Sequence, residues 1–271
     1  MDSLQALVLA LIQGITEFLP VSSSAHLILP AQLLGWPDQG LAFDVAVHVG
    51  TLAACLWLLR REVLGLCIGA YQALRDQSWN DGARLAWALG LATLPVVVVG
   101  FTFKDWIETE LRSVMVIATA TLGFGVLLGL ADRRRGEGDG APLGRLRWQQ
   151  ALFIGAAQCL ALIPGTSRSG ITMTAALALG LDRESSARFS FLLSLPTIAG
   201  AGLLASKDLL ESAEPVAWDV LALGAGASAL AAGLVIKAFL AFVARVGMMP
   251  FVIYRVVLAG VLFALLGAGL A

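Results

Sequence analysis

The chain has 271 residues, of which 58% are hydrophobic and only 14% are charged, whereas about 25% of the residues in an average soluble domain are charged. This composition excludes an ordinary soluble protein and predicts an integral membrane protein. The net charge of −1 provides neither the basic surface of a nucleic-acid-binding protein nor the acidic excess of a solvating tail. The scattered cysteines Cys55, Cys67 and Cys159 fit neither a disulfide framework nor a zinc site.

Apolar stretches dominate the chain, and six of them are long enough to cross a bilayer, which takes about 20 helical residues. Two further apolar regions, 4–34 and 148–181, are interrupted near their middle by proline, serine and glycine residues. The six predicted transmembrane helices run from Leu41 to Leu59, Ala83 to Phe103, Ser113 to Ala131, Ala187 to Ala205, Ala217 to Phe239 and Pro250 to Leu270.

The two interrupted regions predict re-entrant helical hairpins with tips near the middle of the bilayer. The arm from Ala25 to Leu34 has ten residues, which form a helix of about 15 Å and cover only half of the hydrocarbon. Non-helical backbone at that depth is tolerated only inside protein or beside a water-filled cavity. The tips are therefore expected to be buried or to line a cavity.

The order of the elements repeats, since a hairpin and three spans are followed by another hairpin and three spans. This divides the chain into a first repeat (1–131), a basic loop (132–147) and a second repeat (148–271). A shift of 144 residues superposes Pro20 on Pro164, although sequence similarity between the halves is weak. An odd number of spans per half inverts the second half, so the predicted fold is an all-α membrane protein with an inverted-topology repeat.

The distribution of Lys and Arg predicts the orientation, because short cytoplasmic loops carry an excess of both. The loop 132–147 contains five arginines, and the other short basic segments fall on its side if every span crosses once. The opposite loops, 104–112 and 207–214, contain more acids than bases. Both termini are therefore expected outside the cytoplasm.

The first hairpin carries an unexpected carboxylate. Gln13 and Glu17 are four residues apart and share a helical face with Thr16. An acid near the bilayer centre costs about 2.5 to 3.5 kcal/mol on insertion scales, so it is a functional candidate that faces a partner or a cavity. The alternative is a structural ion pair near the membrane interface.

Three serines and a histidine follow Pro20. Ser22, Ser23 and Ser24 precede His26 where a new helix is expected to begin, since serine is a preferred N-cap. The free N–H groups of a helix N-terminus bind anions, so Ser22 and Ser24 are candidate substrate-binding residues. The alternative, that the serines only cap the helix, requires a single hydroxyl.

The second hairpin supplies a cation. Arg168 stands between Ser167 and Ser169, after Thr166, and arginine is suited to two-pronged binding of phosphate. The alternative is that Arg168 serves only as the counter-ion of Glu17. Hydroxyls, an arginine and two helix N-termini that converge from opposite faces predict a strongly anionic ligand, bound in part by Thr166, Ser167 and Ser169.

The segments QGITEFLPVSSSAH, from Gln13 to His26, and PGTSRSG, from Pro164 to Gly170, closely resemble the two signature segments of the bacterial undecaprenyl pyrophosphate phosphatases of the bacitracin-resistance type. The resemblance covers the whole chain and includes PFVIYR, which ends at Arg255. It implies hydrolysis of undecaprenyl pyrophosphate to undecaprenyl phosphate and inorganic phosphate, which recycles the lipid carrier of envelope polymers. It also implies a bacterial plasma membrane location with an active site open to the extracytoplasmic side.

The resemblance implies catalytic roles for Glu17, Ser23, His26 and Arg168. We favour Ser23 as the nucleophile and His26 as its base, and direct attack by His26 stays open. A divalent cation, Mg²⁺ or Ca²⁺, is expected because a pyrophosphate carries more charge than one arginine offsets, with Gln13 and Glu17 as its candidate ligands. The family allows Gln or Glu at the position of Gln13.

Several readings stay open. A lipid-phosphate transporter or flippase shares the architecture of inverted repeats with broken helices, but has no use for a nucleophile, a histidine and a carboxylate within ten residues. A structural subunit leaves these polar groups unexplained. Asp44 and His48 share one face of the first span. Either they line the cavity wall or a second proton path, or Asp44 is simply solvated at the outer interface. Arg255 is expected to extend to the cytoplasmic surface. No nucleic-acid partner is expected, and a homodimer stays open.

Overall fold

The computed structural model describes residues 2–134, 141, 143–211 and 217–270. The regular elements of this part are helices, and six of them are long and apolar enough to cross a membrane, which confirms the six predicted spans. These are α3 (Gly40–Leu58), α5 (Asp81–Thr102), α7 (Val114–Arg133), α10 (Arg183–Glu211), α11 (Trp218–Val246) and α12 (Met249–Gly267).

Two spans are longer than predicted. Helix α10 begins four residues before the expected start at Ala187 and ends six residues after the expected end at Ala205. Helix α11 continues seven residues beyond the expected end at Phe239 and stops at Val246, before Gly247. Gly247 has φ of 73°, a left-handed conformation that only glycine adopts at little cost. Lys237 and Arg245 are exposed on the helix surface, so the helix accommodates both charges.

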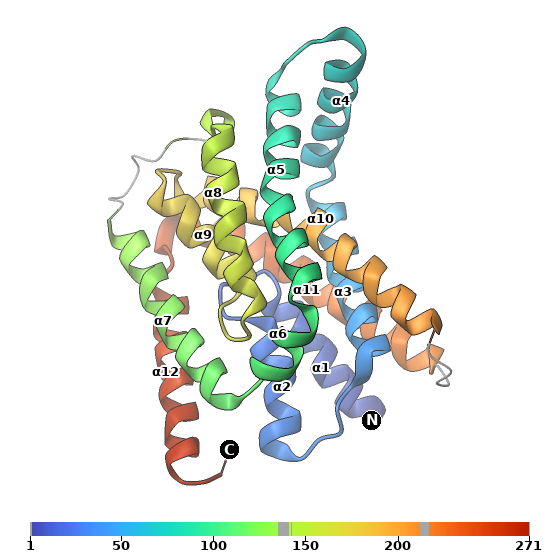
Figure 1. The fold of residues 1–271 in the computed structure, drawn as a ribbon, viewed down its shortest axis with the longest axis vertical. Coiled ribbons are helices and arrows are strands. Elements are labelled where there is room, and N and C mark those ends of the chain that lie inside the picture. Colours follow the sequence, from blue (N-terminus) through green and yellow to red (C-terminus); the bar gives the residue numbers. More distant parts are fainter. Residues whose placement is uncertain (1, 135–140, 142, 212–216, 271) are drawn as a thin grey trace.

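The two interrupted regions form shorter helices joined by irregular turns. The first comprises α1 (Ser3–Thr16) and α2 (Ser23–Leu34), and the second comprises α8 (Trp148–Gln158), the 3₁₀-helix η2 (Cys159–Leu162) and α9 (Arg168–Ala178). In Figure 1, α8 and α9 lie in the upper half of the molecule, and α1 and α2 lie in the lower half. Both chain termini also lie in the lower half.

The two tips share an unusual backbone conformation. Ser22 precedes α2 with φ of 75°, and Ser167 precedes α9 with φ of 70°. The starts of α1 and α8, and those of α2 and α9, are each 145 residues apart. The two halves therefore correspond in structure at a shift of 145 residues, one more than the shift of 144 that aligns the prolines. At this shift Ser22 corresponds to Ser167 rather than to Thr166.

Helix α4 (Arg60–Asp76) was not predicted, because its charged residues resemble a loop. It packs against α5 through two glycines, since a side chain at Gly69 would collide with the backbone of Ala83 and one at Gly82 would collide with Gly65. Asn80 begins α5 by accepting a hydrogen bond from the N–H of Ala83 at 2.9 Å. The short helices α6 (Lys104–Glu110) and η1 (Leu143–Arg145) complete the described elements.

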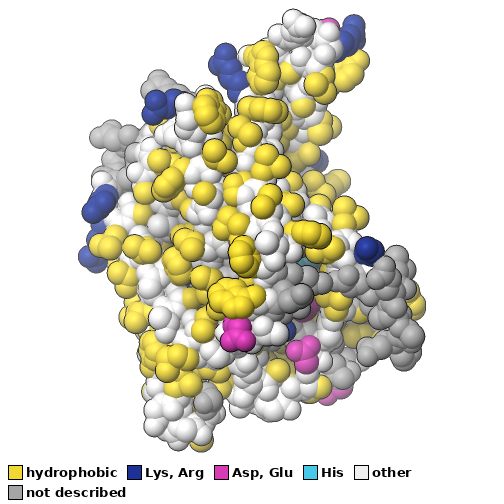
Figure 2. All heavy atoms as spheres, in the orientation of Figure 1, with side chains coloured by type: hydrophobic (Ala, Val, Ile, Leu, Met, Phe, Trp, Pro, Cys, Tyr) yellow, Lys and Arg dark blue, Asp and Glu magenta, His cyan; other side chains and the backbone are white. Residues whose placement is uncertain are grey.

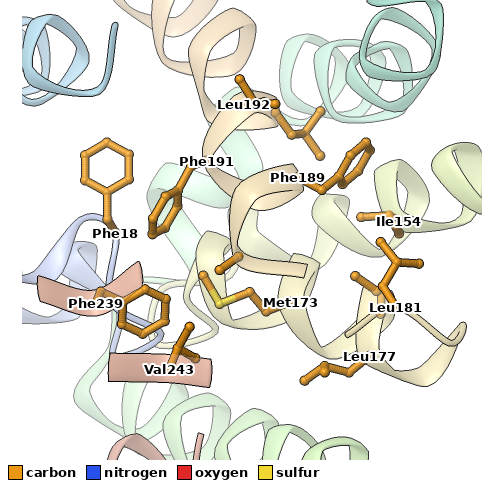
Figure 3. Packing of buried hydrophobic residues seen from close by; sticks show 14 of the residues in the cluster. Phe18, Ile154, Met173, Leu177, Leu181, Phe189, Phe191, Leu192, Phe239 and Val243 are labelled. Atoms are coloured by element: carbon orange, nitrogen blue, oxygen red, sulfur yellow. The ribbon is translucent and has the colours of Figure 1, made fainter. Parts of the chain in front are cut away.

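The main hydrophobic core fixes the first tip against the second repeat. Phe18, which follows Glu17, is fully buried and meets Phe191 of α10 edge to face, with ring centroids 5.2 Å apart. Phe191 in turn contacts Phe239 of α11 at 5.7 Å, and Figure 3 shows these rings beside Met173 of α9. The packing explains why the turn after α1 has a defined position.

The surface has the charge distribution of a membrane protein. Hydrophobic side chains cover much of the middle of the face shown in Figure 2. Most of the Lys and Arg side chains visible there lie at the upper end and along the left edge, and most of the visible acids lie in the lower part.

Candidate functional site

Glu17 is the centre of the candidate site. It caps the end of α1, is 7% exposed and is contacted by side chains from four elements. Its Oε1 accepts a hydrogen bond from Nη2 of Arg168 at 2.7 Å, and its Oε2 accepts from Nε2 of Gln13 at 2.9 Å and from Oγ of Ser23 at 2.6 Å. Nε2 of His48 lies 3.8 Å from the same oxygen. The structure therefore brings Gln13, Glu17, Ser23 and Arg168 together, as expected.

Hydrogen bonds hold the start of the second tip in position against the first. Oγ of Ser169 donates to the carbonyl of Leu19 at 2.8 Å. Oγ of Ser167 accepts from the N–H of Gly170 at 3.1 Å and so caps α9. These contacts hold the start of α9, and with it Arg168, against the turn that follows Glu17.

One terminal nitrogen of Arg168 is available to bind a ligand. One of its terminal nitrogens binds Glu17, while the other, Nη1, is buried and has no hydrogen-bond partner in the described part of the chain. Oγ1 of Thr166 is a further buried atom without such a partner there. An unpaired buried donor is costly, and an anionic ligand would satisfy the arginine.

A cavity of about 370 Å³ opens beside these groups. Ser22, Ser23 and Ser24 of the first tip line it together with Ser167 and Arg168 of the second. Ser22 and Ser167 are buried, whereas Ser24 is exposed at the rim. The remaining wall is formed by Glu17, Leu41, Asp44, Val45, His48, Ala161, Leu162, Thr197, Ile198, Ala201, Gly202 and Ala205. A polar floor with apolar walls suits a lipid with a charged head.

The open question about Asp44 and His48 is resolved, because both residues line the cavity. Nδ1 of His48 is 2.7 Å from the carbonyl oxygen of Asp44, which directs Nε2 toward Glu17. Asp44 accepts a hydrogen bond from Gln39 at 3.0 Å. His48 is therefore a residue of the cavity wall, as one of the two alternatives predicted from its position four residues after Asp44, and its proximity to Glu17 was not predicted.

His26 lies apart from the Glu17 cluster. Its Nδ1 is 2.7 Å from the carbonyl of Ser22, its Nε2 is 2.5 Å from the hydroxyl of Tyr254, and its ring stacks on that of Tyr254. It is not among the residues that line the cavity, and no hydrogen bond to Ser23 occurs among the described residues. The predicted Ser23–His26 pair is thus not assembled in this arrangement.

Arg255 contradicts the expectation that it extends to the surface. The residue is 0% exposed, and its guanidinium donates to carbonyl oxygens of both tips and of α7. The acceptors are Pro20 (3.2 Å), Gly165 (2.9 Å), Thr166 (2.9 Å), Ala120 (3.4 Å) and Thr121 (3.1 Å). Arg255 reaches inward because these irregular turns leave carbonyls without helical partners, and five acceptors compensate its loss of hydration.

The predicted cation ligands are adjacent but do not form a metal site by themselves. Gln13 directs its N–H, rather than its oxygen, toward Glu17, and Arg168 already neutralises the carboxylate. Oε1 of Gln13 is buried and has no hydrogen-bond partner among the residues that the structure describes. No group of three or more His, Cys, Asp and Glu residues suited to a metal occurs among the described residues. A cation here would need most of its ligands from a bound phosphate.

Comparisons with known proteins agree with this geometry. Residues 6–261 match the family described as "Bacitracin resistance protein BacA". The chain is 58% identical over 258 residues to an "Undecaprenyl-diphosphatase" of Alcanivorax borkumensis, covering 95% of this chain and 97% of the relative. It is 53% identical over 271 residues to an "Undecaprenyl-diphosphatase 2" of Stutzerimonas stutzeri, covering 98% of each. A match over nearly the whole length, at this identity, establishes that the chain belongs to the bacitracin resistance protein BacA family.

Proposed function

We propose that this protein hydrolyses undecaprenyl pyrophosphate to undecaprenyl phosphate and inorganic phosphate, and so recycles the lipid carrier and confers bacitracin resistance. The observation that carries the proposal is the contact of Glu17, Ser23 and Arg168 on the wall of one cavity. The two close relatives bear the name of this activity. The cavity combines an anion-binding floor with an apolar wall, as a prenyl pyrophosphate requires.

In the proposed reaction, Arg168 binds the terminal phosphate with its free Nη1 and with the Nη2 that now contacts Glu17. Hydroxyls of Ser22, Ser24 and Ser167 and the N-termini of α2 and α9 contribute further donors. Charge on the phosphoryl oxygens grows in the transition state, and preorganised donors stabilise that charge. Thr166 and Ser169 support the second tip.

Ser23 is the proposed nucleophile, with Glu17 rather than His26 in position to accept its proton. Oγ of Ser23 already donates to Glu17 at 2.6 Å. Attack of this oxygen on the terminal phosphorus breaks the bond to the bridging oxygen, which leaves with undecaprenyl phosphate, while the serine proton moves to Glu17. Water then attacks the phosphoserine, inorganic phosphate departs, and the Ser23 hydroxyl is restored.

Direct attack by His26 is the rival scheme, and the two leave different covalent intermediates. Phosphoserine survives acid and is lost in alkali, whereas phosphohistidine behaves oppositely. After reaction with terminally labelled substrate and rapid denaturation, we expect acid-stable label on Ser23, absent from Ser23→Ala and retained in His26→Ala. Acid-labile label on His26 would contradict the assignment, and label on neither residue would indicate direct attack by water.

The proposed topology is an inverted repeat of two re-entrant hairpins whose tips meet within the bilayer. The equal spacing of helix starts, the matched conformations of Ser22 and Ser167 and the opposite placement of the two hairpins in Figure 1 support it. The basic end would face the cytoplasm, with both termini outside and the cavity open to the extracytoplasmic side.

A divalent cation, Mg²⁺ or Ca²⁺, remains part of the proposal. It would bind mainly to pyrophosphate oxygens, with Glu17 as the protein ligand, and would offset charge that Arg168 alone does not balance. Gln13 would orient Glu17. Hydrolysis should therefore fall strongly in excess chelator and return with added Mg²⁺ or Ca²⁺. Full activity in chelator would remove the cation from the proposal.

The alternative is a transporter or flippase for a phosphorylated lipid. Its supporting observation is the presence of two broken helical segments with matched turns, since transporters also use broken helices. Purified protein in detergent should release phosphate from a prenyl pyrophosphate, and the Ser23→Ala variant should release almost none. A pure transporter would release no phosphate in either form, which would contradict the proposed function.

A further inference from the structure

A second cavity, of about 360 Å³, lies where α3 passes into α4 and faces α10 and α11. None of its residues lines the cavity around Glu17. Basic and aliphatic side chains dominate its wall. The residues that line it are Leu58, Leu59, Arg60, Arg61, Glu62, Arg188, Ile236, Lys237 and Leu240.

The positive charge of this cavity is only partly compensated. Arg188 is paired with Glu62 at 2.7 Å and with Glu184 at 2.9 Å. Arg61 and Lys237 are exposed, come from different helices and have no ion-pair partner in the described part of the chain. Two unpaired cations that converge on a cavity attract an anion, and the planar guanidinium of arginine matches the geometry of a phosphate group.

The aliphatic half of the wall indicates which phosphate compound binds. Leu58, Ile236 and Leu240 belong to the spans α3 and α11, and Trp57, next to Leu58 on α3, is 69% exposed. Cζ of Arg60 lies over the ring of Trp57, 4.8 Å from the ring centroid, and tryptophan is typical of the membrane interface. A free ion would not need this apolar surface, whereas a lipid would.

We propose that this pocket binds the phosphate group of an anionic membrane lipid, with Arg61 and Lys237 as its main contacts and the acyl chains along α3 and α11. Basic pockets between transmembrane helices recognise lipid head groups in this way. The site is separate from the catalytic cavity, so lipid composition could affect the protein without competing for the substrate site.

The test compares phosphatidylglycerol, phosphatidylcholine and inorganic phosphate as probes of the purified full-length protein, by native mass spectrometry and thermal shift. The variant Arg61→Ala/Lys237→Ala should bind phosphatidylglycerol about thirtyfold more weakly, since each basic residue near a lipid surface contributes about 1 kcal/mol. Arg84→Ala/Arg245→Ala, which removes two exposed arginines outside the pocket, is the matched control and should bind normally. Arg168→Ala should also bind normally.

Other outcomes would overturn the proposal. Equal binding of phosphatidylcholine would show that the head-group charge is irrelevant. Tight binding of inorganic phosphate without the lipid would indicate a free-ion site. Loss of phosphatidylglycerol in the control pair would indicate non-specific charge, and loss in Arg168→Ala would mean that the lipid occupies the catalytic cavity.

A second inference concerns Arg255 and rests on the proposed function. Its guanidinium joins the carbonyls of Pro20, Gly165 and Thr166, which belong to the two tips, and no carboxylate pairs with it among the described residues. Gly125 and Gly170 leave room for it, since a Cβ at either would lie 3.1 Å from a guanidinium nitrogen. We infer that Arg255 is a positioning residue that sets the distance between the Ser23 and Arg168 tips.

Arg255→Lys tests this role, because lysine keeps the charge but donates at most three hydrogen bonds. We expect kcat to fall on the order of a hundredfold, because a displacement of catalytic groups by about 1 Å causes a loss of that size. KM should stay nearly unchanged, and thermal stability should fall modestly. Val252→Ala, a buried residue one turn earlier, should lower stability and keep kcat. Wild-type kcat in Arg255→Lys would reduce Arg255 to a structural role, whereas inactive wild-type protein would contradict the proposed function instead.

Discussion

At the residue scale, the site depends on one carboxylate that organises four neighbours. Glu17 alone, near the middle of a membrane protein, would be costly, and so would Arg168 alone. Their hydrogen bond at 2.7 Å offsets the cost of burying each charge and holds both side chains at the cavity, where a substrate would bind. When pyrophosphate enters, Arg168 can exchange a carboxylate for a phosphate, and Glu17 then becomes free to accept the proton of Ser23.

The arginine is therefore predicted to be irreplaceable by lysine. Arg168→Lys retains the charge but loses the planar, two-pronged contact, so kcat should fall about a hundredfold or more, which corresponds to roughly 3 kcal/mol of transition-state stabilisation. Steady-state phosphate release measures this effect. The control is Arg183→Lys. Arg183 donates hydrogen bonds of 2.6 and 3.2 Å to the buried carboxylate of Asp132, and neither residue lines the cavity. That control should lose stability and keep its turnover. Normal turnover in Arg168→Lys would make Arg168 a structural counter-ion.

His48 is predicted to assist Glu17. Its Nε2 is 3.8 Å from the carboxylate, and His48→Ala removes a ring that helps to hold Glu17 while leaving Ser23 and Arg168 in place. We expect roughly a tenfold loss of kcat, smaller than the loss of about a hundredfold or more that removal of a direct general acid or base causes. His26→Ala is the comparison, measured by the same assay. A larger effect of His26→Ala than of His48→Ala would show that catalysis uses an arrangement other than the one described here.

At the element scale, the irregular turns before α2 and α9 each contain a serine with positive φ and place a helix N-terminus at the cavity. Ser22 and Ser167 hold φ near 75° and 70°, a region that costs a non-glycine residue about 1–3 kcal/mol. The cost is offset by the packing of Phe18 and by the hydrogen bonds of Arg255.

Substitution of Ser22 should reveal this cost in thermal unfolding. Ser22→Gly should raise the free energy of unfolding by about 1 kcal/mol, because glycine adopts positive φ without penalty, and Ser22→Val should lower it. The control is Ser206→Gly in the regular helix α10, which should be destabilising by about 0.5 kcal/mol. A loss of stability in Ser22→Gly as large as that of Ser206→Gly would contradict the observed turn conformation.

At the scale of the whole molecule, the fold separates a basic end from the end that carries the termini, and the catalytic cavity should open away from the basic end. Ser24 is exposed at the cavity rim, while Cys67 is exposed on α4, between the arginines of the basic end. The positive-inside tendency of membrane proteins then predicts opposite accessibility for these two positions.

Labelling with a membrane-impermeant maleimide in intact cells tests this orientation. Ser24→Cys, in a background with Cys67→Ser and Cys159→Ser, should react from outside. Native Cys67, with Cys159→Ser, should react only after permeabilisation. The reverse pattern would mean that the cavity opens to the cytoplasm. Ser22 and Ser169 are poorer reporters, because the structure buries both.

The amino-acid sequence by itself determined the class of protein, the six spans and the two polar segments, because each depends on local features: the length of an apolar run, the position of a proline, or adjacent hydroxyls and charges. It also identified Glu17, Ser23 and Arg168 as candidates. The helix α4 was missed because its apolar face is diluted by charges, so its stability depends on packing against α5.

Only the tertiary structure decided which candidates meet. Helical spacing allowed Ser23 and His26 to share a face, but the turn at Ser22 directs Ser23 to Glu17 and His26 to Tyr254. His48 reaches Glu17, and Arg255 turns inward, because contacts between residues far apart in the chain depend on how the helices pack. Local sequence signals do not contain those distances, and a buried polar group takes whichever partner the packed helices bring within hydrogen-bonding reach.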